Sequence, residues 1–513
     1  MTPPAEGSAQ GPGGLRRTKI VATLGPATSA AHTVAAMVAA GLDVARVNLA
    51  HGRLDEHRAA IAAVRAAAAA AGREVGVMID LPGPKLRLGG VDAPLSLTFD
   101  QKVRLSAQSG AEADAGVVAA CPDGCVVLPV TFPELLAHLA PGQRVLVDDG
   151  AVELVVTEAT TTGRAPGGPL LRVVVPGVVS SSKGVNLPDT PLPVPALTAR
   201  DEELLRFGVD EDVDLVALSF VRAAEDVRRL RALVAEAGGD QLVVAKIEKR
   251  DALAAIDDIV AAADAVMVAR GDLGVEIPPA EVPLWQKRIV ALARACGKPV
   301  ITATQMLQSM VAAPRPTRAE ASDVANAILD STDAVMLSGE TAVGAFPVEA
   351  VRTMAEIATT VEAEIVAGTA PDAPPREADA PPDDAACLVT ASGRVTAAIS
   401  SGACDVACRV GAAAIVTATV SGTMGRAVAR HRPPQPVVAL TPRRRTARQL
   451  ALSWGVLPVL DEPVHELDDL MAEAAASVRG AGLGRAGDTI VITCGMHVFE
   501  SGGTNLIKTH VLE

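Results

Sequence analysis

The feature that most constrains the fold is a unit that repeats from residue 18: a short run rich in β-branched residues, followed by an alanine-rich run with helical character. Eight strand-like runs can be read, and helix-like sequence follows each of them except the third. Alternating strands and helices are typical of parallel α/β architecture, and a count of eight predicts a closed (β/α)₈ TIM barrel. The runs are TKIVATL, VARVNL, VGVMID, LVALSF, LVVAKIE, AVMVAR, PVITAT and AVMLSG.

The repeat is interrupted once and later ends, which divides the chain into domains. After VGVMID the helical pattern gives way to short strands and Gly/Pro turns, so we expect an inserted β-barrel lid domain at 85–191. The barrel would then comprise 18–84 and 192–362, after a flexible tail at 1–17. Residues 363–382 are proline-rich and acidic and indicate a linker or exposed loop. At 383–513, the runs AAIVTAT, PVVALTP and TIVITCG predict a C-terminal α/β domain with parallel strands.

Composition excludes several classes of partner. No apolar run approaches the roughly 20 residues of a membrane-spanning helix, and the N-terminal residues lack the apolar core of a signal peptide. We therefore expect a cytoplasmic protein without a membrane partner. A formal net charge of -14 argues against nucleic acid as a partner, and the one arginine run, 443–445, is expected to be a solvated face. The seven cysteines show no disulfide or zinc framework.

Polar residues occupy the carboxyl ends of nearly all the predicted barrel strands, where the working residues of TIM barrels lie. One such residue could belong to a structural ion pair, but convergence from so many strands indicates a site. Because strand side chains alternate, Lys246 and Glu248 share a face and both can reach the barrel mouth. The strand-end residues are Arg46, Asn48, Asp80, Ser219, Lys246, Glu248, Asp272, Thr304, Ser338 and Glu340.

Two of these carboxylates indicate a metal. Glu248 and Asp272 would repel each other without a cation, and oxygen ligands suit Mg²⁺ or Mn²⁺. The alternative is a simple Lys246–Glu248 salt bridge. Beside them, the run from Gly271 to Gly274 lets backbone amides approach a substrate carboxylate or phosphate.

Four cations indicate transfer of an anionic group. Phosphoryl transfer depends on positive charge placed around the migrating group, and Arg46, Lys246, Arg87 and Lys183 can supply it from the barrel and the insertion. No GxxxxGK[ST] run occurs, so a nucleotide would be held in another way.

With these residues assembled, the chain closely resembles the pyruvate kinase family over residues 16–513. The resemblance rests on TKIVATLGP, VARVNLAHG, KGVNLP, AKIEKRDAL, MVARGDLGVEIP, ATQMLQSM, PRPTRAEASDVANAILD and MLSGETAVGAFPVEAV. It implies a barrel with a mobile lid and a C-terminal domain that often carries an effector site. It also implies the glycolytic reaction in which phosphoenolpyruvate and ADP give pyruvate and ATP.

The resemblance also implies residue roles. Glu248 and Asp272 would hold the divalent ion, and Lys246 and Arg46 would contact the transferring phosphoryl group. The amides of Gly271 and Asp272, with the Thr304 hydroxyl, would receive the substrate carboxylate. Proton delivery to the enolate would run through water near Thr304, Ser338 and Glu340. The nucleotide phosphates would be reached by Arg87 and Lys183, with Asn48 and His51 lining that side; for His51 a hydrogen bond within its own loop is the alternative.

The chain departs from the family pattern at the potassium site. Many members bind K⁺ within N-[FL]-S-H-G and D-T-x-G-P-E. This chain keeps Asn48 and Asp80, but has Ala50 for the Ser, Leu81 for the Thr and Lys85 for the Glu. Two ligand oxygens are lost and an ammonium is gained, so we predict that Lys85 replaces K⁺ and that catalysis does not require the ion.

The sequence of the C-terminal domain indicates regulation, but it does not identify the effector. Thr419, Ser421, Gly422 and Thr423 resemble the family's effector-phosphate loop, so a phosphorylated metabolite is an expected effector; a packed turn without ligand is the alternative. The resemblance suggests a homotetramer. Two other functions are alternatives: a pyruvate-enolate lyase or aldolase, which would not need Arg87 and Lys183, and a non-catalytic regulatory relative, which would be expected to lose Lys246 or the metal ligands.

Overall fold

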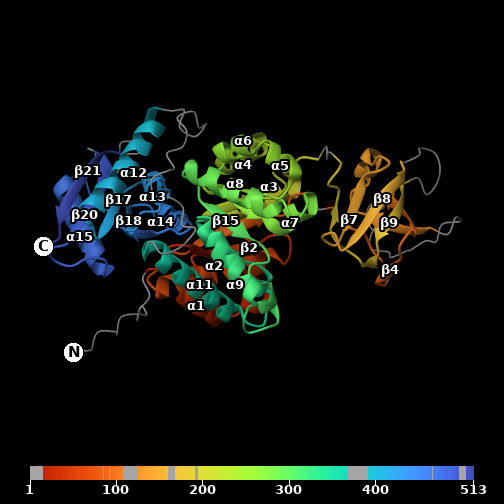
Figure 1. Ribbon diagram of the computed structural model, residues 1–513, viewed down its shortest axis with the longest axis horizontal. Coiled ribbons are helices and arrows are strands. Elements are labelled where there is room, and N and C mark those ends of the chain that lie inside the picture. The colour runs from red at the N-terminus through yellow and green to blue at the C-terminus, as the bar shows by residue number, and fades with distance from the viewer. Residues whose placement is uncertain are drawn as a thin grey trace.

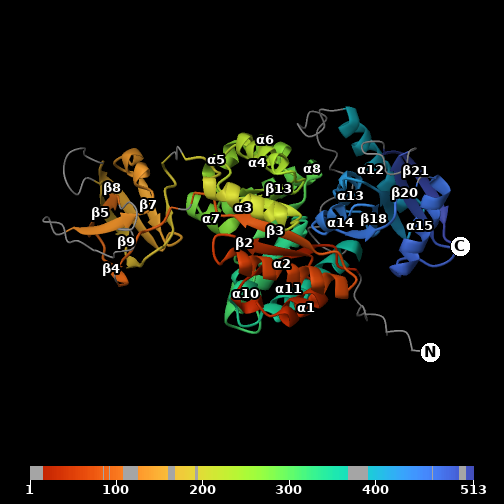
Figure 2. The same cartoon turned by 180° about the vertical axis from the view of Figure 1, so that it is seen from behind.

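A computed structural model describes the chain over residues 15–84, 86–91, 93–107, 125–159, 168–190, 194–367, 391–464, 466–495 and 504–513. Three bodies follow one another along its longest axis (Figure 1): the inserted domain, the barrel and the C-terminal domain. In the view from behind (Figure 2) the barrel again lies between the other two.

The central body is the predicted barrel. Eight parallel strands close in the order β1-β16-β15-β14-β13-β12-β3-β2, and all eight coincide with the runs read from the sequence. The fold-class prediction is confirmed. Their bounds are β1 Lys19–Leu24, β2 Val44–Asn48, β3 Gly76–Leu81, β12 Leu215–Leu218, β13 Leu242–Ile247, β14 Ala265–Ala269, β15 Val300–Ala303 and β16 Ala334–Leu337.

Side-chain alternation along these strands produces two apolar layers. One set, which includes Val21, Met78 and Met267, fills the barrel interior, and Leu452 of the C-terminal domain packs against it. The other set faces the surrounding helices. Because the interior is packed with side chains, it supports the strand ends as a rigid base.

The barrel helices begin where the sequence supplies caps. Thr198 accepts a hydrogen bond from the backbone of Asp201 at the start of α3, and Thr317 does the same with Glu320 at α9. The elements around the strands are α1 Ala31–Ala40, α2 Leu54–Ala70, α3 Ala199–Asp210, α4 Ala224–Glu236, α5 Arg250–Ala254, α6 Ile256–Ala262, α7 Arg270–Glu276, α8 Val282–Ala295, α9 Arg318–Leu329, α10 Gly339–Ala342 and α11 Pro347–Ala367, with the 3₁₀ turns η1 Pro26–Thr28 and η4 Gln308–Val311.

The insertion after β3 is a separate β domain, here called the lid. It has a six-stranded sheet in the order β11-β7-β8-β9-β5-β6 and a two-stranded sheet of β10 and β4, both packed on one apolar core. The elements are β4 Leu95–Leu97, β5 Lys102–Ala107, β6 Val126–Val130, η3 Pro133–His138, β7 Arg144–Val147, β8 Val152–Glu158, β9 Leu170–Val175, β10 Gly177–Val179 and β11 Val185–Asn186.

The C-terminal domain is a five-stranded sheet in the order β19-β18-β17-β20-β21. The sequence predicts three of these strands, and β19 and the antiparallel edge strand β21 complete the sheet. Its elements are α12 Ala391–Arg409, β17 Ala414–Ala418, α13 Thr423–Ala429, β18 Val437–Thr441, α14 Arg444–Leu450, β19 Val456–Leu460, α15 Leu467–Gly480, β20 Thr489–Gly495 and β21 Thr504–Val511.

Several residues that the sequence assigns to the tail and the linker contact the barrel or belong to its last helix. Arg16, within the expected tail, pairs with Asp43 at 2.7 Å, and the backbone N–H of Arg17 donates to Glu362 at 2.7 Å. Helix α11 continues to Ala367, beyond residue 362. Residues 368–390, which include most of the expected linker, lie outside the described part of the chain.

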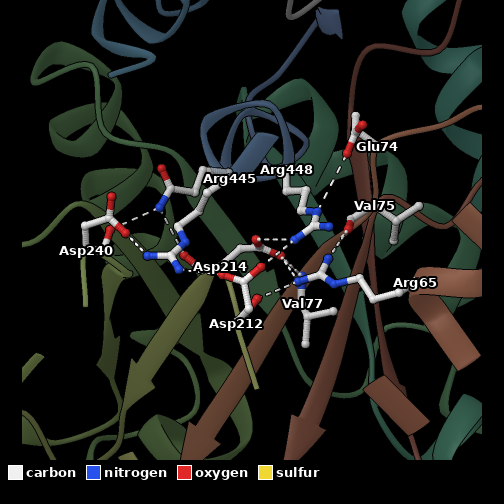
Figure 3. A network of polar contacts seen from close by, with 10 residues as sticks. Arg65, Glu74, Val75, Val77, Asp212, Asp214, Asp240, Arg445 and Arg448 are labelled. Atoms are coloured by element: carbon white, nitrogen blue, oxygen red, sulfur yellow. Dashed lines mark hydrogen bonds and ion pairs between the residues drawn. The ribbon is translucent and has the colours of Figure 1, made fainter. Parts of the chain in front are cut away.

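An ion-pair network joins helix α14 to the end of the barrel at which the strands begin (Figure 3). Arg445 pairs with Asp212 and Asp240, and Arg448 Nη1 lies 3.0 Å from Asp212. The expectation of a solvated arginine run is therefore wrong for Arg445, whose partners come from a distant part of the chain. Nearby, Asp214 is buried and accepts from Arg65 and from the Val77 backbone, each at 2.8 Å.

In the described ranges, no helix has both the length and the apolar character that crossing a membrane requires.

Candidate active site

Four polar side chains meet at the open end of the barrel, and Asp80 lies at their centre. Arg46, on β2, donates to Asp80 Oδ2 through Nε at 2.8 Å. Lys246, on β13, lies 3.3 Å from Asp80 Oδ1 and donates to Ser219 Oγ at 2.6 Å, and Ser219 in turn donates to Asp80 Oδ1 at 3.2 Å. Thr23 Oγ1 accepts from Arg46 at 2.9 Å. The predicted convergence of strand ends brings these groups into direct contact.

Burial and charge fix the ionisation of this cluster. Burial alone would lower the pKa of Lys246, but the neighbouring carboxylates of Asp80 and Glu248 outweigh it and raise that pKa. Burial alone would raise the pKa of Asp80, but Lys246 and Arg46 hold it below its usual value. Lys246 is thus a permanent cation at physiological pH.

Glu248 has one oxygen bonded and one oriented toward the site. Oε1 accepts from the backbone N–H of Phe220 at 2.7 Å. Oε2 lies 3.2 Å from Lys246 Nζ, yet has no hydrogen-bond donor of good geometry among the described residues. Burial, reinforced by the negative charge of Asp272, raises the pKa of Glu248 although Lys246 opposes the shift. A buried oxygen without a donor, next to a second carboxylate, fits a cation ligand.

A buried ion pair supports the Phe220 turn. Phe220 has φ of 58°, in the left-handed region that a bulky residue rarely adopts. Lys249 Nζ lies 5.1 Å from the centre of its ring and 2.7 Å from Glu276 Oε1, and both partners are buried. On this side, where the lid joins the barrel, a cavity of about 360 Å³ is lined by Pro84, Phe220, Lys249 and Glu276 among others.

Asp272, Gly271 and Thr304 lie at the ends of β14 and β15. Asp272 is exposed, in the first turn of α7. The Gly271 N–H donates to Thr304 Oγ1 at 2.7 Å, and Thr304 has φ of 70°. The side chains described include no group of three or more His, Cys, Asp or Glu that could hold a metal, so an ion here would have two protein carboxylates and would need oxygens from substrate and water.

Ser338 and Glu340 follow β16 but differ in their hydrogen-bond partners. The Glu340 carboxylate is fully buried, and its two oxygens accept from the backbones of Leu307 at 3.0 Å and Ser338 at 2.7 Å. Ser338 Oγ, in contrast, is buried without a partner in the described chain. The hydroxyl is available to a ligand, whereas the carboxylate organises the loop.

Family models and relatives identify the chain's family. A model of the pyruvate kinase barrel domain matches residues 15–351, and a model of the pyruvate kinase alpha/beta domain matches 397–510. The chain belongs to the pyruvate kinase family. The pyruvate kinase of Agrobacterium vitis is 42% identical over 499 residues, which cover 96% of this chain and 98% of that protein. That of Mycobacterium intracellulare is 42% identical over 496 residues, with 96% and 98% covered.

A third relative, the pyruvate kinase of Sporosarcina psychrophila, is 40% identical over 503 residues, covering 97% of this chain and 81% of that protein. By this membership the chain is an enzyme of the phosphotransferase class.

The pyruvate kinase lid cations lie together but contact lid residues in this structure. Lys183 Nζ lies 2.9 Å from Asp148, and Arg87 Nη1 donates to the Ser182 carbonyl at 2.7 Å. Residues 87 and 184 form an antiparallel bridge, so the two cations belong to neighbouring segments. On the barrel side, Asn48 Oδ1 accepts from the Ala50 backbone at 3.2 Å, and His51 is exposed in the loop after β2.

At the potassium site of the family, the oxygens that remain are engaged within the protein. Both oxygens of Asp80 contact Arg46, Lys246 or Ser219, as given above. The Leu81 side chain is fully buried. Lys85, the predicted replacement for K⁺, lies outside the described residues.

The predicted effector loop forms a compact turn before α13. The Gly422 N–H donates to Thr419 Oγ1 at 3.0 Å, and the Ser421 and Thr423 hydroxyls lie 2.9 Å apart. Arg426, one turn into α13, donates to the Ser421 carbonyl at 2.9 Å. A guanidinium therefore contacts this loop even though residue 423 is a threonine.

Sequence reasoning missed the supporting groups Thr23, Lys249 and Glu276, and it placed Phe220 at the end of the fourth strand run without giving it a role. Thr23 and Phe220 stand at barrel-strand ends, the same signal that found the others. No signal in the sequence pairs Lys249 with Glu276, because helices α5 and α6, strand β14 and the rest of helix α7 lie between the two positions along the chain.

Proposed function

We propose that this enzyme transfers the phosphoryl group of phosphoenolpyruvate to ADP, giving pyruvate and ATP in glycolysis. The observation that carries the proposal is the buried cluster of Lys246, Asp80 and Glu248 at the barrel mouth of a pyruvate kinase family member. Phosphoryl transfer needs fixed charge more than covalent chemistry, and this cluster supplies an ammonium held charged by two carboxylates.

Glu248 and Asp272 would hold a Mg²⁺ or Mn²⁺ ion. The buried Oε2 of Glu248, which has no hydrogen-bond donor among the described residues, and the repulsion between the two carboxylates fit that role. When bound, the ion would neutralise charge on the substrate oxygens. Arg46 and Lys246 contact the phosphoryl group from the other side. Lys246 then stabilises the enolate left behind, since its raised pKa keeps the ammonium protonated throughout.

The substrate carboxylate is received by the amides of Gly271 and Asp272 and by the Thr304 hydroxyl. The Gly271 N–H now donates to Thr304 Oγ1, so the substrate would replace that hydroxyl as the acceptor. The left-handed backbone of Thr304 holds the hydroxyl beside the glycine.

Protonation of the enolate carbon completes the reaction. Ser338 is the better candidate for the relay of a proton from water, since its hydroxyl has no partner among the described residues. Glu340 would position the loop that carries Ser338, because its oxygens accept from the Ser338 and Leu307 amides.

The nucleotide would bind between barrel and lid. Arg87 and Lys183 reach the ADP phosphates once the lid closes, and Lys183 would then exchange Asp148 for phosphate. Asn48 and His51 line the barrel side. A charge-assisted bond to phosphate is stronger than a half-exposed ion pair, which favours the exchange.

Catalysis is proposed not to depend on K⁺, with Lys85 in the place of the ion. The engagement of both Asp80 oxygens by protein donors supports this proposal, as do Ala50 and Leu81 in place of ligand residues. The remaining expectations, a phosphorylated effector at Thr419, Ser421, Gly422 and Thr423, a homotetramer and a cytoplasmic location, stay predictions.

Pyruvate formation from phosphoenolpyruvate, ADP and Mg²⁺ tests the proposal, in K⁺ buffer and in buffer where a bulky organic cation replaces K⁺. ADP-dependent pyruvate release in both buffers is expected. Release in K⁺ alone would refute K⁺ independence and leave the reaction standing. No ADP-dependent release in either buffer would refute the reaction: a lyase would form pyruvate without ATP, and a regulatory relative would bind without turnover.

A further inference from the structure

Arg270 lies behind the proposed carboxylate site and contacts both strand ends that form it. It is the first residue of α7, directly before Gly271, and its guanidinium reaches the end of the neighbouring strand β15. There Nη2 donates to the Thr304 carbonyl at 2.9 Å, and Nε donates to the Ala303 carbonyl at 3.3 Å. One side chain therefore joins the backbone that carries the Gly271 amide to the backbone that carries the Thr304 hydroxyl.

The guanidinium of Arg270 is itself held in one orientation. Nη1 and Nη2 each lie 2.7 Å from an oxygen of Asp323, on α9, and Nη2 lies 2.8 Å from Met306 Sδ. The arginine side chain is 13% exposed. A planar guanidinium that binds a carboxylate through two parallel bonds keeps a fixed direction, which a lysine ammonium does not reproduce. Asp323 thus sets the direction from which Arg270 donates to the two carbonyls.

The turn that Arg270 binds has a strained backbone. Thr304 and Gln305 have φ of 70° and 54°, so two successive residues with side chains adopt the left-handed region, at a cost of about 1–2 kcal/mol each. Such a conformation persists only where the surrounding structure holds it. The Thr304 carbonyl, which accepts from Arg270, belongs to the peptide bond between these two residues. Arg270 therefore holds the strained turn at its centre.

Arg270 also makes it easier for the Thr304 hydroxyl to turn toward a ligand. In this structure the hydroxyl donates to the Ala303 carbonyl at 2.6 Å and accepts from the Gly271 N–H at 2.7 Å. A substrate carboxylate that binds both groups takes the hydroxyl away from that carbonyl. Ala303 is fully buried, where loss of a donor is costly, but Arg270 Nε still donates to its carbonyl.

A purely structural ion pair is the alternative role for Arg270 and Asp323. Such a pair would join α7 to α9 without any contact with the turn after β15. The bonds from Arg270 to the Ala303 and Thr304 carbonyls go beyond that role, because they end on the backbone on either side of the Thr304 side chain.

We propose that Arg270 is a positioning residue for the substrate carboxylate. It holds the Thr304 hydroxyl and the Gly271 amide 2.7 Å apart, close enough for one carboxylate to bind both. The inference rests on the proposed function, since the carboxylate is that of phosphoenolpyruvate. Arg270 acts through Thr304, and Asp323 acts through Arg270. The carboxylate keeps its charge while the phosphoryl group moves, so the loss should appear in substrate binding and not in the chemical step.

Steady-state kinetics of the full chain test the proposal. Arg270→Gln should raise KM for phosphoenolpyruvate about tenfold, with kcat nearly unchanged. Arg270→Lys keeps the charge but does not hold both carbonyls and Asp323, so it should not restore the wild-type KM. Arg409→Gln is the matched control: it removes the same charge from an exposed pair with Asp405 and should keep the wild-type KM.

A double-mutant cycle with Thr304→Val shows whether Arg270 acts through the hydroxyl. Arg270→Gln should change KM much less in the Thr304→Val background than in the wild type, since the group that it positions is already gone. A purely structural role of Arg270 would multiply the two effects. If Arg270→Gln does not fold, Asp323→Asn, which removes the charge that orients the guanidinium, takes its place in the same cycle.

Three results would each overturn the proposal: a wild-type KM in both Arg270 variants, effects on KM that multiply in the cycle, or a fall in kcat at unchanged KM. The last would place the action of Arg270 on Asp272 and the metal. Each of these results, with an active wild type, leaves the proposed function standing. A wild type that forms no pyruvate from phosphoenolpyruvate and ADP would overturn the proposed function and this inference together.

Discussion

Replacing Lys249 by methionine tests whether the buried Lys249–Glu276 pair supports the proposed metal site. The pair is 2.7 Å long, with side chains 9% and 5% exposed. Removing one partner of such a pair leaves an uncompensated buried charge, at a cost of about 3–5 kcal/mol. For a domain of this size that corresponds to a fall of about 10 °C in the unfolding midpoint.

The same change should also affect Glu248, the proposed metal ligand. Lys249 packs on the Phe220 ring, and the Phe220 N–H binds Glu248 Oε1. Loss of such a supporting contact typically weakens metal binding by about tenfold or more. We therefore expect weaker Mn²⁺ binding, measured directly from the spin-resonance signal of free Mn²⁺, as well as the lower midpoint.

Two further variants distinguish the effect of an unpaired buried charge from the effect of removing a lysine. Lys249→Met with Glu276→Leu removes both charges and should recover most of the midpoint, since an apolar pair can replace a buried ion pair. Lys102→Met, at an exposed lid lysine, should leave midpoint and Mn²⁺ affinity unchanged. If Lys249→Met matches wild type in both measurements, the pair does not support the site.

Three more predictions follow from the described contacts. Burial raises the pKa of Asp214 to about 6 from 3.8. The protonated carboxyl therefore stabilises the folded state below pH 4, and this contribution is lost as pH rises through 6. In denaturant titrations the wild type should lose about 3 kcal/mol of unfolding free energy between pH 4 and 7, relative to Asp214→Asn. Ser338→Ala should lower kcat for pyruvate formation by about a hundredfold at an unchanged unfolding midpoint; an unaltered kcat would remove Ser338 from the proton relay. Asp80→Asn should lower the pKa of Lys246, visible in its ¹⁵N chemical shift on titration, because the first of the three carboxylates that raise it, Asp80, Glu248 and Asp272, is gone; an identical titration would contradict that cause.

The barrel could be predicted from sequence because its signal is local and repeated. Eight runs with the strand period, each next to a helical run, leave few other folds, and the polar residue at the end of a run is placed by that run alone. Asp80, Lys246 and Glu248 were found in this way, and the family stretches agree with them.

What could not be predicted depends on neighbours far apart in the chain. The sequence predicts a solvated Arg445, but in the structure this side chain pairs with Asp212 and Asp240. The sequence predicts Asp80 at an ion site, and its contacts with Arg46 and Lys246, which the sequence does not show, place it at the centre of the polar cluster at the barrel mouth. For Glu340, the sequence shows a carboxylate at a strand end, but only the structure shows that backbone amides occupy both oxygens.

The most direct test of the proposed chemistry is the rate of pyruvate formation by Glu248→Gln and Asp272→Asn, at saturating phosphoenolpyruvate, ADP and Mg²⁺. Loss of one metal ligand should lower kcat by at least about a thousandfold, while Glu281→Gln, an exposed residue at the start of α8, keeps the wild-type rate. If folded Glu248→Gln and Asp272→Asn turn over as fast as wild type, these carboxylates hold no catalytic metal.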